Sequence, residues 1–313
     1  MKNKKTVLVT GGAGFIGSHI VDKLIVNKYQ VIVVDDLSCG CEKNVNKKAV
    51  LHKLKVQDEK LENIFKKNKF DHVFHLAAQK NVRVSVDNPI QDAKDNIIGS
   101  LNLLENCRKY KIRKIIFSST GGAIYGDTNI LPTTESHLNA PISPYGVAKL
   151  SVEKYLHYYN KVHKIRYVCL RYANVYGPRQ DPKGEAGVVA VFISQLLKKY
   201  TPVINGNGKQ TRDYVFVDDV VQANILAMKE KAQGIYNVGT GIETDVNKLF
   251  FEIAKGMNLK IKPKHGPALI GEQMTSCLSN KKIKKELNFK VGTNLTVGIK
   301  ETINWFNDNF KNN

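Results

Sequence analysis

The sequence predicts a doubly wound α/β fold, with a parallel β-sheet between two layers of helices. Short apolar runs alternate with amphipathic segments of helical length; these runs are 6–10, 31–35, 72–77, 115–119 and 167–170. Strands that are apolar along their whole length are typical of a parallel sheet covered on both faces. A glycine-rich turn directly after the first run is a further mark of this fold.

Length and composition agree with a folded protein of this class. The chain has 313 residues, of which 42% are hydrophobic, so it can bury a sizeable core. It contains no apolar run of about eighteen residues, and the apolar stretch near its basic start breaks at Gly11 and Gly12. We therefore expect a cytoplasmic protein with no membrane partner. Five cysteines without zinc-ligand spacing indicate reduced thiols and no metal site.

The charge pattern favours a small anionic substrate over nucleic acid. The formal net charge is +20, but the lysines are scattered through many segments with few interleaved aromatic residues. This pattern is typical of solvated faces, and a positive field still attracts small anions. We expect no nucleic-acid partner.

The first predicted strand ends in TGGAGFIGS at 10–18, which opens a helix. Its glycines let the chain turn tightly and bring backbone N–H groups and the helix N-terminus against a pyrophosphate. Asp35 ends the second strand, where a carboxylate accepts a hydrogen bond from a ribose 2′-hydroxyl and repels a 2′-phosphate. We therefore expect NAD rather than NADP as the cofactor. The expected contacts in this region are Gly11, Gly14, Phe15, Ile16, Gly17 and Asp35.

The segment SPYGVAK at 143–149 predicts the start of a helix that carries acid-base chemistry. Ser143 can cap the helix and Pro144 fits its first turn. Tyr145 and Lys149 then lie four residues apart on one face, where an ammonium lowers the pKa of a phenol towards the range of a general base.

The segment FSSTGGAIYG at 117–126 ends a predicted strand with hydroxyl groups. Ser119 or Thr120 could share a substrate oxygen with the phenol of Tyr145. Tyr110 and Lys114 have the same spacing as Tyr145 and Lys149, but they lie on the approach to a strand, so we regard them as a coincidental match.

The pattern becomes less regular after Tyr172. Turn-rich pieces follow, and two further helices are predicted at about 279–287 and 295–310. We expect residues 1–172 to form an NAD-binding Rossmann domain and residues 173–313 to form mainly a substrate-binding lobe. The segment at about 205–238 is expected to return to the first domain, so that the two lobes interleave.

Motifs along nearly the whole chain carry a resemblance to a known family. They are TGGAGFIGS, VIVVDDLS, FHLAAQ, NIIGSLNLLE, FSSTGGAIYG, SPYGVAK, LRYANVYGPRQDP, TRDYVFVDDV and YNVGTG. With these motifs the chain resembles the extended short-chain dehydrogenase/reductases, and most of all the NAD-dependent nucleotide-sugar epimerases typified by UDP-glucose 4-epimerase. The resemblance implies 4-epimerisation of UDP-hexoses through a transient 4-keto sugar. It also implies a homodimer formed by helices around 90–110 and 144–164.

The resemblance assigns roles to residues on both sides of the reacting sugar. It implies that Tyr145 is the base, that Lys149 holds the nicotinamide ribose and that Thr120 or Ser119 orients the sugar hydroxyl. Further NAD contacts are implied at Lys80, Asn96 and Tyr172. Substrate contacts are implied at Asn174, Arg212, Glu272 and Ser276, with Arg212 clamping the diphosphate.

Three positions narrow or modify this resemblance. Related dehydratases and decarboxylases place acidic residues directly after the strand-end hydroxyl, whereas this chain has Gly-Gly-Ala at 121–123, which indicates epimerisation. Leu269 replaces a diphosphate-binding arginine of the family, and Arg179 is a candidate substitute. Lys55 stands at an acidic position near the adenine, so the backbone or Asp58 is expected to serve there.

The sequence leaves alternatives open both for the substrate and for the class of function. The resemblance places Ser276 at the substrate gate, where a small residue implies a pocket that also admits N-acetyl sugars, so UDP-GlcNAc and UDP-GalNAc are expected as further substrates beside UDP-glucose and UDP-galactose. UDP-glucuronate 4-epimerisation, or another nucleotide-sugar reaction on the same fold, is one alternative. A non-catalytic NAD-binding protein and a sequence-independent DNA binder are more distant ones, and the paired Tyr145 and Lys149 argue against a simple binding module.

Overall fold

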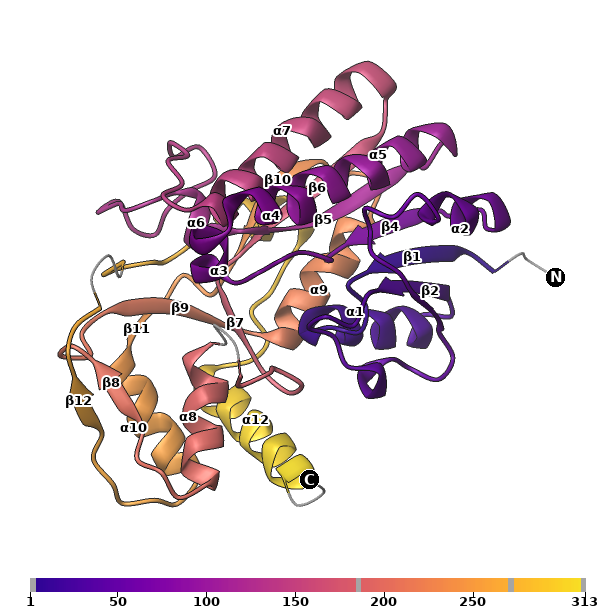
Figure 1. The fold of residues 1–313 in the computed structure, drawn as a ribbon. Helices are drawn as coiled ribbons and strands as arrows, with labels where there is room; N and C mark the ends of the chain where they lie inside the picture. Colours follow the sequence, from indigo (N-terminus) through magenta and orange to yellow (C-terminus); the bar gives the residue numbers. More distant parts are fainter. Residues whose placement is uncertain (1–3, 184–186, 270–272, 311–313) are drawn as a thin grey trace.

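A seven-stranded sheet forms the centre of the larger lobe in the computed structural model, which describes residues 4–183, 187–269 and 273–310 (Figure 1). The strands lie in the order β10-β6-β5-β4-β1-β2-β3, and neighbouring strands are parallel throughout. Their bounds are β1 (Thr6–Thr10), β2 (Gln30–Asp35), β3 (Val50–Lys53), β4 (His72–His75), β5 (Lys114–Thr120), β6 (Arg166–Tyr172) and β10 (Gly234–Val238). The predicted doubly wound parallel sheet is confirmed.

Two strands of this sheet lie outside the five predicted apolar runs, and both are edge strands. β3 is partly exposed along its whole length, so it has no continuous apolar run to reveal it. β10 is supplied by a segment far along the chain and pairs with β6 in parallel register, Gly234 opposite Val168. An edge strand is covered less completely than a central one, and this weakens its hydrophobic signal.

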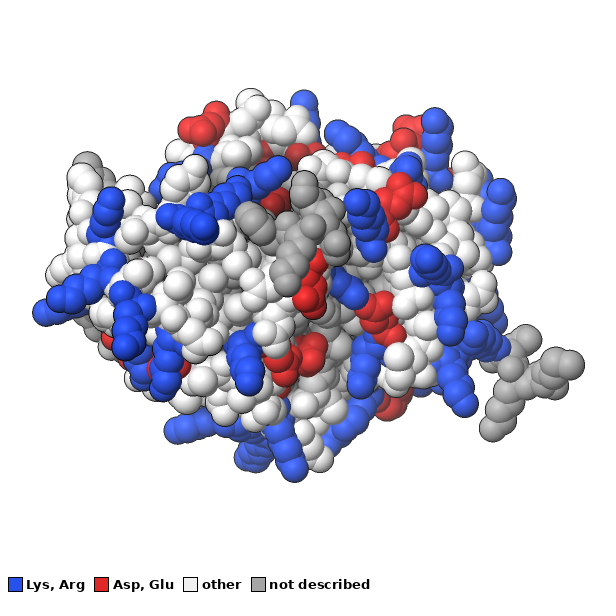
Figure 2. All heavy atoms as spheres, turned by 90° about the horizontal axis from the view of Figure 1, so that it is seen from below, with Lys and Arg blue, Asp and Glu red and all other residues white. Residues whose placement is uncertain are grey.

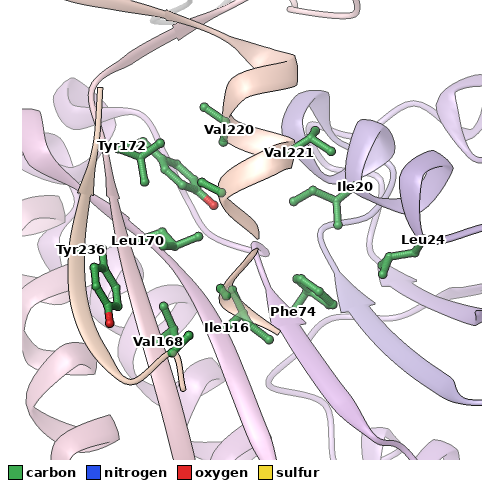
Figure 3. Packing of buried hydrophobic residues seen from close by; sticks show 14 of the residues in the cluster. Ile20, Leu24, Phe74, Ile116, Val168, Leu170, Tyr172, Val220, Val221 and Tyr236 are labelled. Carbon is green, nitrogen blue, oxygen red and sulfur yellow. The ribbon is translucent and has the colours of Figure 1, made fainter. Parts of the chain in front are cut away.

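One face of the sheet is covered by α1 (Phe15–Val26), α9 (Val217–Ala227) and α11 (Lys281–Leu287). Apolar side chains from α1 and α9 pack against side chains of the central strands (Figure 3). The residues labelled in that view are Ile20, Leu24, Phe74, Ile116, Val168, Leu170, Tyr172, Val220, Val221 and Tyr236. This close packing fixes α1, and with it the glycine-rich turn, relative to the strand ends.

The opposite face is covered by α2 (Leu61–Lys67), α5 (Gly99–Lys109) and α7 (Pro144–His163), with α5 and α7 running side by side (Figure 1). Before α5 come α3 (Val82–Asp87), α4 (Pro89–Ala93) and a π-helical turn, η2 (Lys94–Ile98). The predicted start of α7 is confirmed, because the Ser143 side chain accepts a hydrogen bond from Gly146 N and Pro144 begins the helix.

The smaller lobe contains a three-stranded sheet, a two-stranded sheet and three helices. These elements are β7 (Asn174–Tyr176), β8 (Val203–Asn205), β9 (Thr211–Phe216), β11 (Glu243–Asp245), β12 (Lys264–Gly266), α8 (Val188–Leu197), α10 (Val246–Gly256) and α12 (Leu295–Phe310). Two short helical turns, η1 (Glu42–Asn44) and α6 (Gly121–Ile124), belong to loops of the larger lobe. The buried carboxylate of Asp213 on β9 accepts hydrogen bonds from Thr240 N, Gly241 N and Leu278 N, which holds the segments at 240–241 and at 278 beside β9.

The face shown in Figure 2 carries its positive charge in a dispersed form. On the face shown in Figure 2, lysine and arginine side chains are spread among uncharged surface, and acidic side chains lie between them. Among the helices that the structure describes, none has the length and apolar character needed to cross a membrane.

Candidate active site

A cavity of about 640 Å³ lies at the carboxyl ends of the central strands. This edge of a doubly wound sheet is where such folds bind ligands. Its walls come from the glycine-rich turn, the loops after β2 and β4, the ends of β5 and β6, and the start of α7. The predicted site residues in its lining are Gly11, Gly14, Phe15, Ile16, Gly17, Asp35, Lys80, Ser119, Thr120, Tyr145, Lys149 and Tyr172.

The glycine-rich turn leaves no room for side chains at two of its positions. Gly11 has φ +72°, and a Cβ atom there would lie 2.6 Å from the backbone nitrogen of Ala77. A Cβ atom on Gly17 would lie 2.1 Å from the carbonyl oxygen of Gly11. The bare backbone therefore forms one wall of the cavity at the N-terminal end of α1, as a pyrophosphate site requires.

Asp35 closes the same end of the cavity with an oriented carboxylate. Its Oδ2 accepts a hydrogen bond from Ala13 N at 2.9 Å, and its Oδ1 accepts one from Leu37 N at 2.9 Å. Burial raises the pKa of Asp35, and these two backbone donors act in the opposite direction. A carboxylate fixed beside a pyrophosphate-type turn fits the ribose of NAD, and its charge disfavours a 2′-phosphate.

Tyr145 and Lys149 lie on the first two turns of α7 and line the cavity. Lys149 Nζ donates to the carbonyl oxygen of Ser118 at 2.9 Å and lies 5.8 Å from the centre of the Tyr145 ring. Burial lowers the pKa of Lys149 to about 8 and raises the pKa of Tyr145. In the protein alone, burial is the main cause of the raised pKa of Tyr145, and the negative charge of Asp92 raises this pKa further.

The two candidate hydroxyls at the end of β5 have different partners. Ser119 is almost fully buried, and its Oγ donates to Glu153 Oε1 at 2.6 Å. Thr120 caps α6 by accepting a hydrogen bond from Ala123 N at 3.3 Å, which leaves its hydroxyl able to donate. Both residues line the cavity, but the Ser119 hydroxyl is already engaged by a charged protein partner.

A buried ion pair that the sequence analysis missed lies behind Ser119. Glu153 on α7 and Arg171 on β6 are each 1% exposed, and they share two hydrogen bonds of 2.6 and 2.9 Å. Glu153 follows Tyr145 and Lys149 on the same helical face, one turn further on. This spacing could have indicated Glu153 from the sequence. Arg171 lies inside an apolar strand, and no sequence pattern indicated that it has a partner.

The remaining predicted residues lie away from the cavity wall. Asn96 is buried and donates to the Gln79 carbonyl at 3.0 Å. Arg179 forms an ion pair with Asp22 of α1 at 2.8 Å. Asn174 and Arg212 belong to the paired strands β7 and β9 of the smaller lobe.

The predicted substrate gate lies beside the strand that carries Arg212. The backbone nitrogen of Ser276 donates to the Thr211 carbonyl at 3.2 Å, and Leu269 is 40% exposed. Glu272 lies outside the described residues. Near the Asp35 end, Lys55 lines the cavity, while the carboxylate of Asp58 accepts from Lys60 N.

The loop after β5 is tightly packed at its first glycine. A Cβ atom on Gly121 would lie 2.3 Å from Leu278 Cδ1, whereas one on Gly122 would meet nothing within 4 Å. A side chain at 121 would therefore have to displace Leu278. Gly121, Gly122 and Ala123 bring no ionisable group to the position where the predicted reaction type is decided.

Comparison with known proteins agrees with this geometry. Residues 7–239 match the NAD dependent epimerase/dehydratase family. The chain belongs to this family. It is 47% identical over 303 residues to a putative UDP-glucose 4-epimerase of Methanocaldococcus jannaschii, covering 97% of this chain and 99% of the relative.

Two solved structures of family members superpose closely on the chain. The UDP-glucose 4-epimerase of Thermotoga maritima with UDP-glucose has a TM-score of 0.95 at 48% identity, covering 97% of this chain and 99% of the other. The UDP-N-acetylglucosamine 4-epimerase of Methanobrevibacter ruminantium in complex with UDP-N-acetylmuramic acid has a TM-score of 0.93 at 37% identity, covering 98% and 99%.

Proposed function

We propose that the protein is an NAD-dependent 4-epimerase of UDP-hexoses. The observation that carries this proposal is the cavity in which Tyr145, Lys149 and Thr120 meet beside a dinucleotide-type turn. The resemblance to the epimerases of Thermotoga maritima and Methanocaldococcus jannaschii supports the same conclusion. Dehydratases share the family, so the residues around the reacting sugar must distinguish the two reactions.

The cofactor end of the cavity has residues that suit the pyrophosphate and the adenosine ribose of NAD. Gly11, Gly14, Phe15, Ile16 and Gly17 form the pyrophosphate turn, and Asp35 accepts from the adenosine ribose. Lys149, Lys80 and Tyr172 line the part towards the reacting sugar. Asn96 does not line the cavity, but it donates a hydrogen bond to the backbone carbonyl of Gln79, which does. When bound, NAD supplies an acceptor and later a donor of hydride at the sugar C4.

The chain's own groups manage the proton of the C4 hydroxyl. Tyr145 takes this proton as the 4-keto sugar forms and returns it to the new C4 oxygen after the sugar has turned about its diphosphate link. Lys149, protonated at neutral pH, stabilises the phenolate of Tyr145. We assign the hydroxyl that orients the sugar to Thr120, because the Ser119 hydroxyl donates to Glu153.

Epimerisation is favoured over elimination by what surrounds Thr120. Loss of water from the sugar needs a general acid and a general base near C5 and C6. Gly121 packs against Leu278, and no residue of 121–123 carries an ionisable side chain. With Tyr145 as the proton carrier and bound NAD as the acceptor and donor of hydride, C4 would be oxidised and then reduced on the opposite face of the turned sugar, which inverts its configuration.

The substrate nucleotide is proposed to bind between this cavity and the smaller lobe. Arg212 and Asn174 lie on adjacent strands there, and the Ser276 backbone bonds to the strand of Arg212. Arg212 suits a diphosphate because its guanidinium presents a planar fork of donors. The resemblance to an epimerase of UDP-N-acetylglucosamine supports a pocket that also accepts N-acetyl sugars.

The product of a direct incubation tests this proposal. Purified protein is incubated separately with UDP-glucose, UDP-GlcNAc and UDP-glucuronate, and the nucleotide sugars are resolved by chromatography. We expect UDP-galactose from UDP-glucose, with no net formation of NADH. Conversion of UDP-glucuronate alone would redirect the substrate assignment, and a 4-keto-6-deoxy product or no conversion would refute the epimerase proposal.

We also propose that the protein works as a homodimer in a reducing cytoplasm. α7 has exposed apolar side chains at Val147, Tyr155, Tyr158 and Val162, and Ile98 at the end of η2, which packs against α7, is exposed too. A second copy that places the same helices against these side chains would bury them. The five cysteines are all unpaired thiols, as such a compartment favours. Light scattering of the wild type and of Tyr158→Glu tests the dimer, and an unchanged monomeric mass for both would refute it.

We propose the division into two lobes from the distribution of the strands along the chain. Residues 1–172 carry six strands of the large sheet, and the segment at about 205–238 adds β10 to it. The rest of 173–313 mainly forms the smaller lobe, where the nucleotide sugar is proposed to bind.

A further inference from the structure

Asp92 is a buried carboxylate with no role in the proposed mechanism. It lies on α4 and is 2% exposed. Its Oδ1 accepts hydrogen bonds from Gln79 Nε2 and Asn96 Nδ2, each at 2.9 Å. Its Oδ2 is buried without a hydrogen-bond partner. A buried charge with half of its acceptors unused is costly unless an opposite charge lies nearby.

The hydrogen bonds of Asp92 join three segments at the cavity wall. Gln79 belongs to the loop after β4, lines the cavity and also donates through Nε2 to the Asn81 carbonyl at 2.9 Å. Asn96 on η2 donates a second bond to the Gln79 carbonyl. The carboxylate therefore fixes the loop that carries Lys80 against α4 and η2.

The same two segments pack against α7, which carries Tyr145 and Lys149. The negative charge of Asp92 acts on both residues: it raises the pKa of Lys149 and that of Tyr145. Lys149 in turn lowers the pKa of Asp92, which burial raises. Lys149 is therefore a cation on the neighbouring helix whose charge acts on the buried carboxylate.

We propose that Asp92 is a positioning residue of the active site, whose carboxylate balances the charge of the Lys149 ammonium and fixes the Gln79 loop against α7. This inference rests on the epimerase function proposed above. Asp92 itself touches neither the sugar nor the reacting atoms. Its charge acts on the ammonium of Lys149 and on the phenol of Tyr145.

The direction of the effect follows from the charges. Burial lowers the pKa of Lys149 to about 8, and Asp92 opposes that decrease. Without the carboxylate, both the ammonium of Lys149 and the phenol of Tyr145 would lose their protons at lower pH. The other titratable groups that act on Lys149 or Asp92, or on which Lys149 acts, are Glu153 on α7, Cys169 on β6, His75 on β4 and Asp95 on η2.

Asp92→Asn removes the charge and keeps the shape. The amide oxygen can still accept from Gln79 and Asn96, so the loop stays attached and the fold is retained. The matched control is Asp87→Asn, which removes one negative charge from an exposed position at the end of α3. We expect both limbs of the pH profile of kcat to move to lower pH by about one unit in Asp92→Asn. The profile of Asp87→Asn should superpose on that of the wild type.

A second readout needs neither substrate nor turnover. Acetic anhydride labels neutral amines, and mass spectrometry of the digested protein gives the extent of labelling at Lys149 across a pH series. The labelling midpoint of Lys149 should be lower by about one unit in Asp92→Asn than in the wild type. An unchanged midpoint would overturn the proposal, as would a loss of activity in Asp92→Asn at every pH without displaced limbs. If the wild type proves inactive as an epimerase, the labelling still tests Asp92.

Discussion

Tyr145 and Lys149 share their spacing with Tyr110 and Lys114, and both lysines are buried, with 4% and 1% of their surface exposed. Burial lowers the pKa of each lysine to about 8. The ammonium groups of the two lysines differ in their hydrogen-bond acceptors. Lys114 Nζ donates to three carbonyl oxygens at and after the C-terminal end of α9, at 2.6, 3.0 and 3.3 Å. Lys149 Nζ donates to one carbonyl and lines the cavity.

The tyrosines differ in the same way. Tyr110 donates its hydroxyl to Glu62 at 2.8 Å, and it is not among the residues that line the cavity. Tyr145 lines the cavity one helical turn before Lys149. A buried lysine with a lowered pKa marks a functional site only where part of its hydrogen-bonding capacity faces space that a ligand can occupy. All three hydrogen bonds that the Lys114 ammonium can donate go to carbonyl oxygens at and after the end of α9.

The largest effect is expected from Tyr145→Phe. Loss of the proton carrier should reduce kcat by roughly a thousandfold or more, while NAD stays bound and the fold is unchanged. Turnover of UDP-glucose and the NAD content of the purified variant measure this. Tyr110→Phe is the matched control and should keep full activity; comparable losses in the two variants would remove the distinction between the pairs.

A smaller loss of activity is expected from Lys149→Met. The variant loses the cation beside Tyr145 and a donor at the cofactor cavity, so kcat should fall by roughly a hundredfold and NAD should bind more weakly. Thermal unfolding should occur at a lower temperature, because the buried carboxylate of Asp92 loses the positive charge that offsets it. Activity near that of the wild type would mean that Lys149 is a structural lysine of the same kind as Lys114.

Lys114→Met should lower stability and leave activity unchanged. The change leaves carbonyl oxygens at the end of α9 buried without a donor, which should cost about 1–3 kcal/mol of unfolding free energy. The kcat measured below the unfolding transition should be unchanged, because Lys114 lies far from the cavity lining. Urea denaturation gives the stability change, and a large loss of kcat with intact stability would contradict this role.

The parts of the molecule that could be predicted from sequence depend on local signals. β1 follows its predicted bounds, and the start of α7 needs only Ser143 and Pro144. Tyr145 and Lys149 then share a face by helical geometry alone. These features are set by residues within one or two turns of each other, so no knowledge of the tertiary structure is required.

The features that could not be predicted depend on partners far away in the chain. Arg171 lies within an apolar strand, and only the fold brings it to Glu153 on α7. Asp92 carries no sequence signal, because its importance comes from packing α4 against α7. The substrate contacts are the least determined, because Arg212 and Asn174 lie on strands of the smaller lobe outside the cavity lining, and Glu272 lies outside the described residues.

The central claim is that C4 of the sugar is oxidised and then reduced again by the same hydrogen, with Tyr145 carrying only the hydroxyl proton. Incubation of the protein with UDP-glucose deuterated at C4, followed by mass spectrometry and NMR of the products, tests this most directly. We predict UDP-galactose that retains the deuterium at C4. Deuterium lost to solvent, or transferred to C6 in a 4-keto-6-deoxy sugar, would contradict the claim.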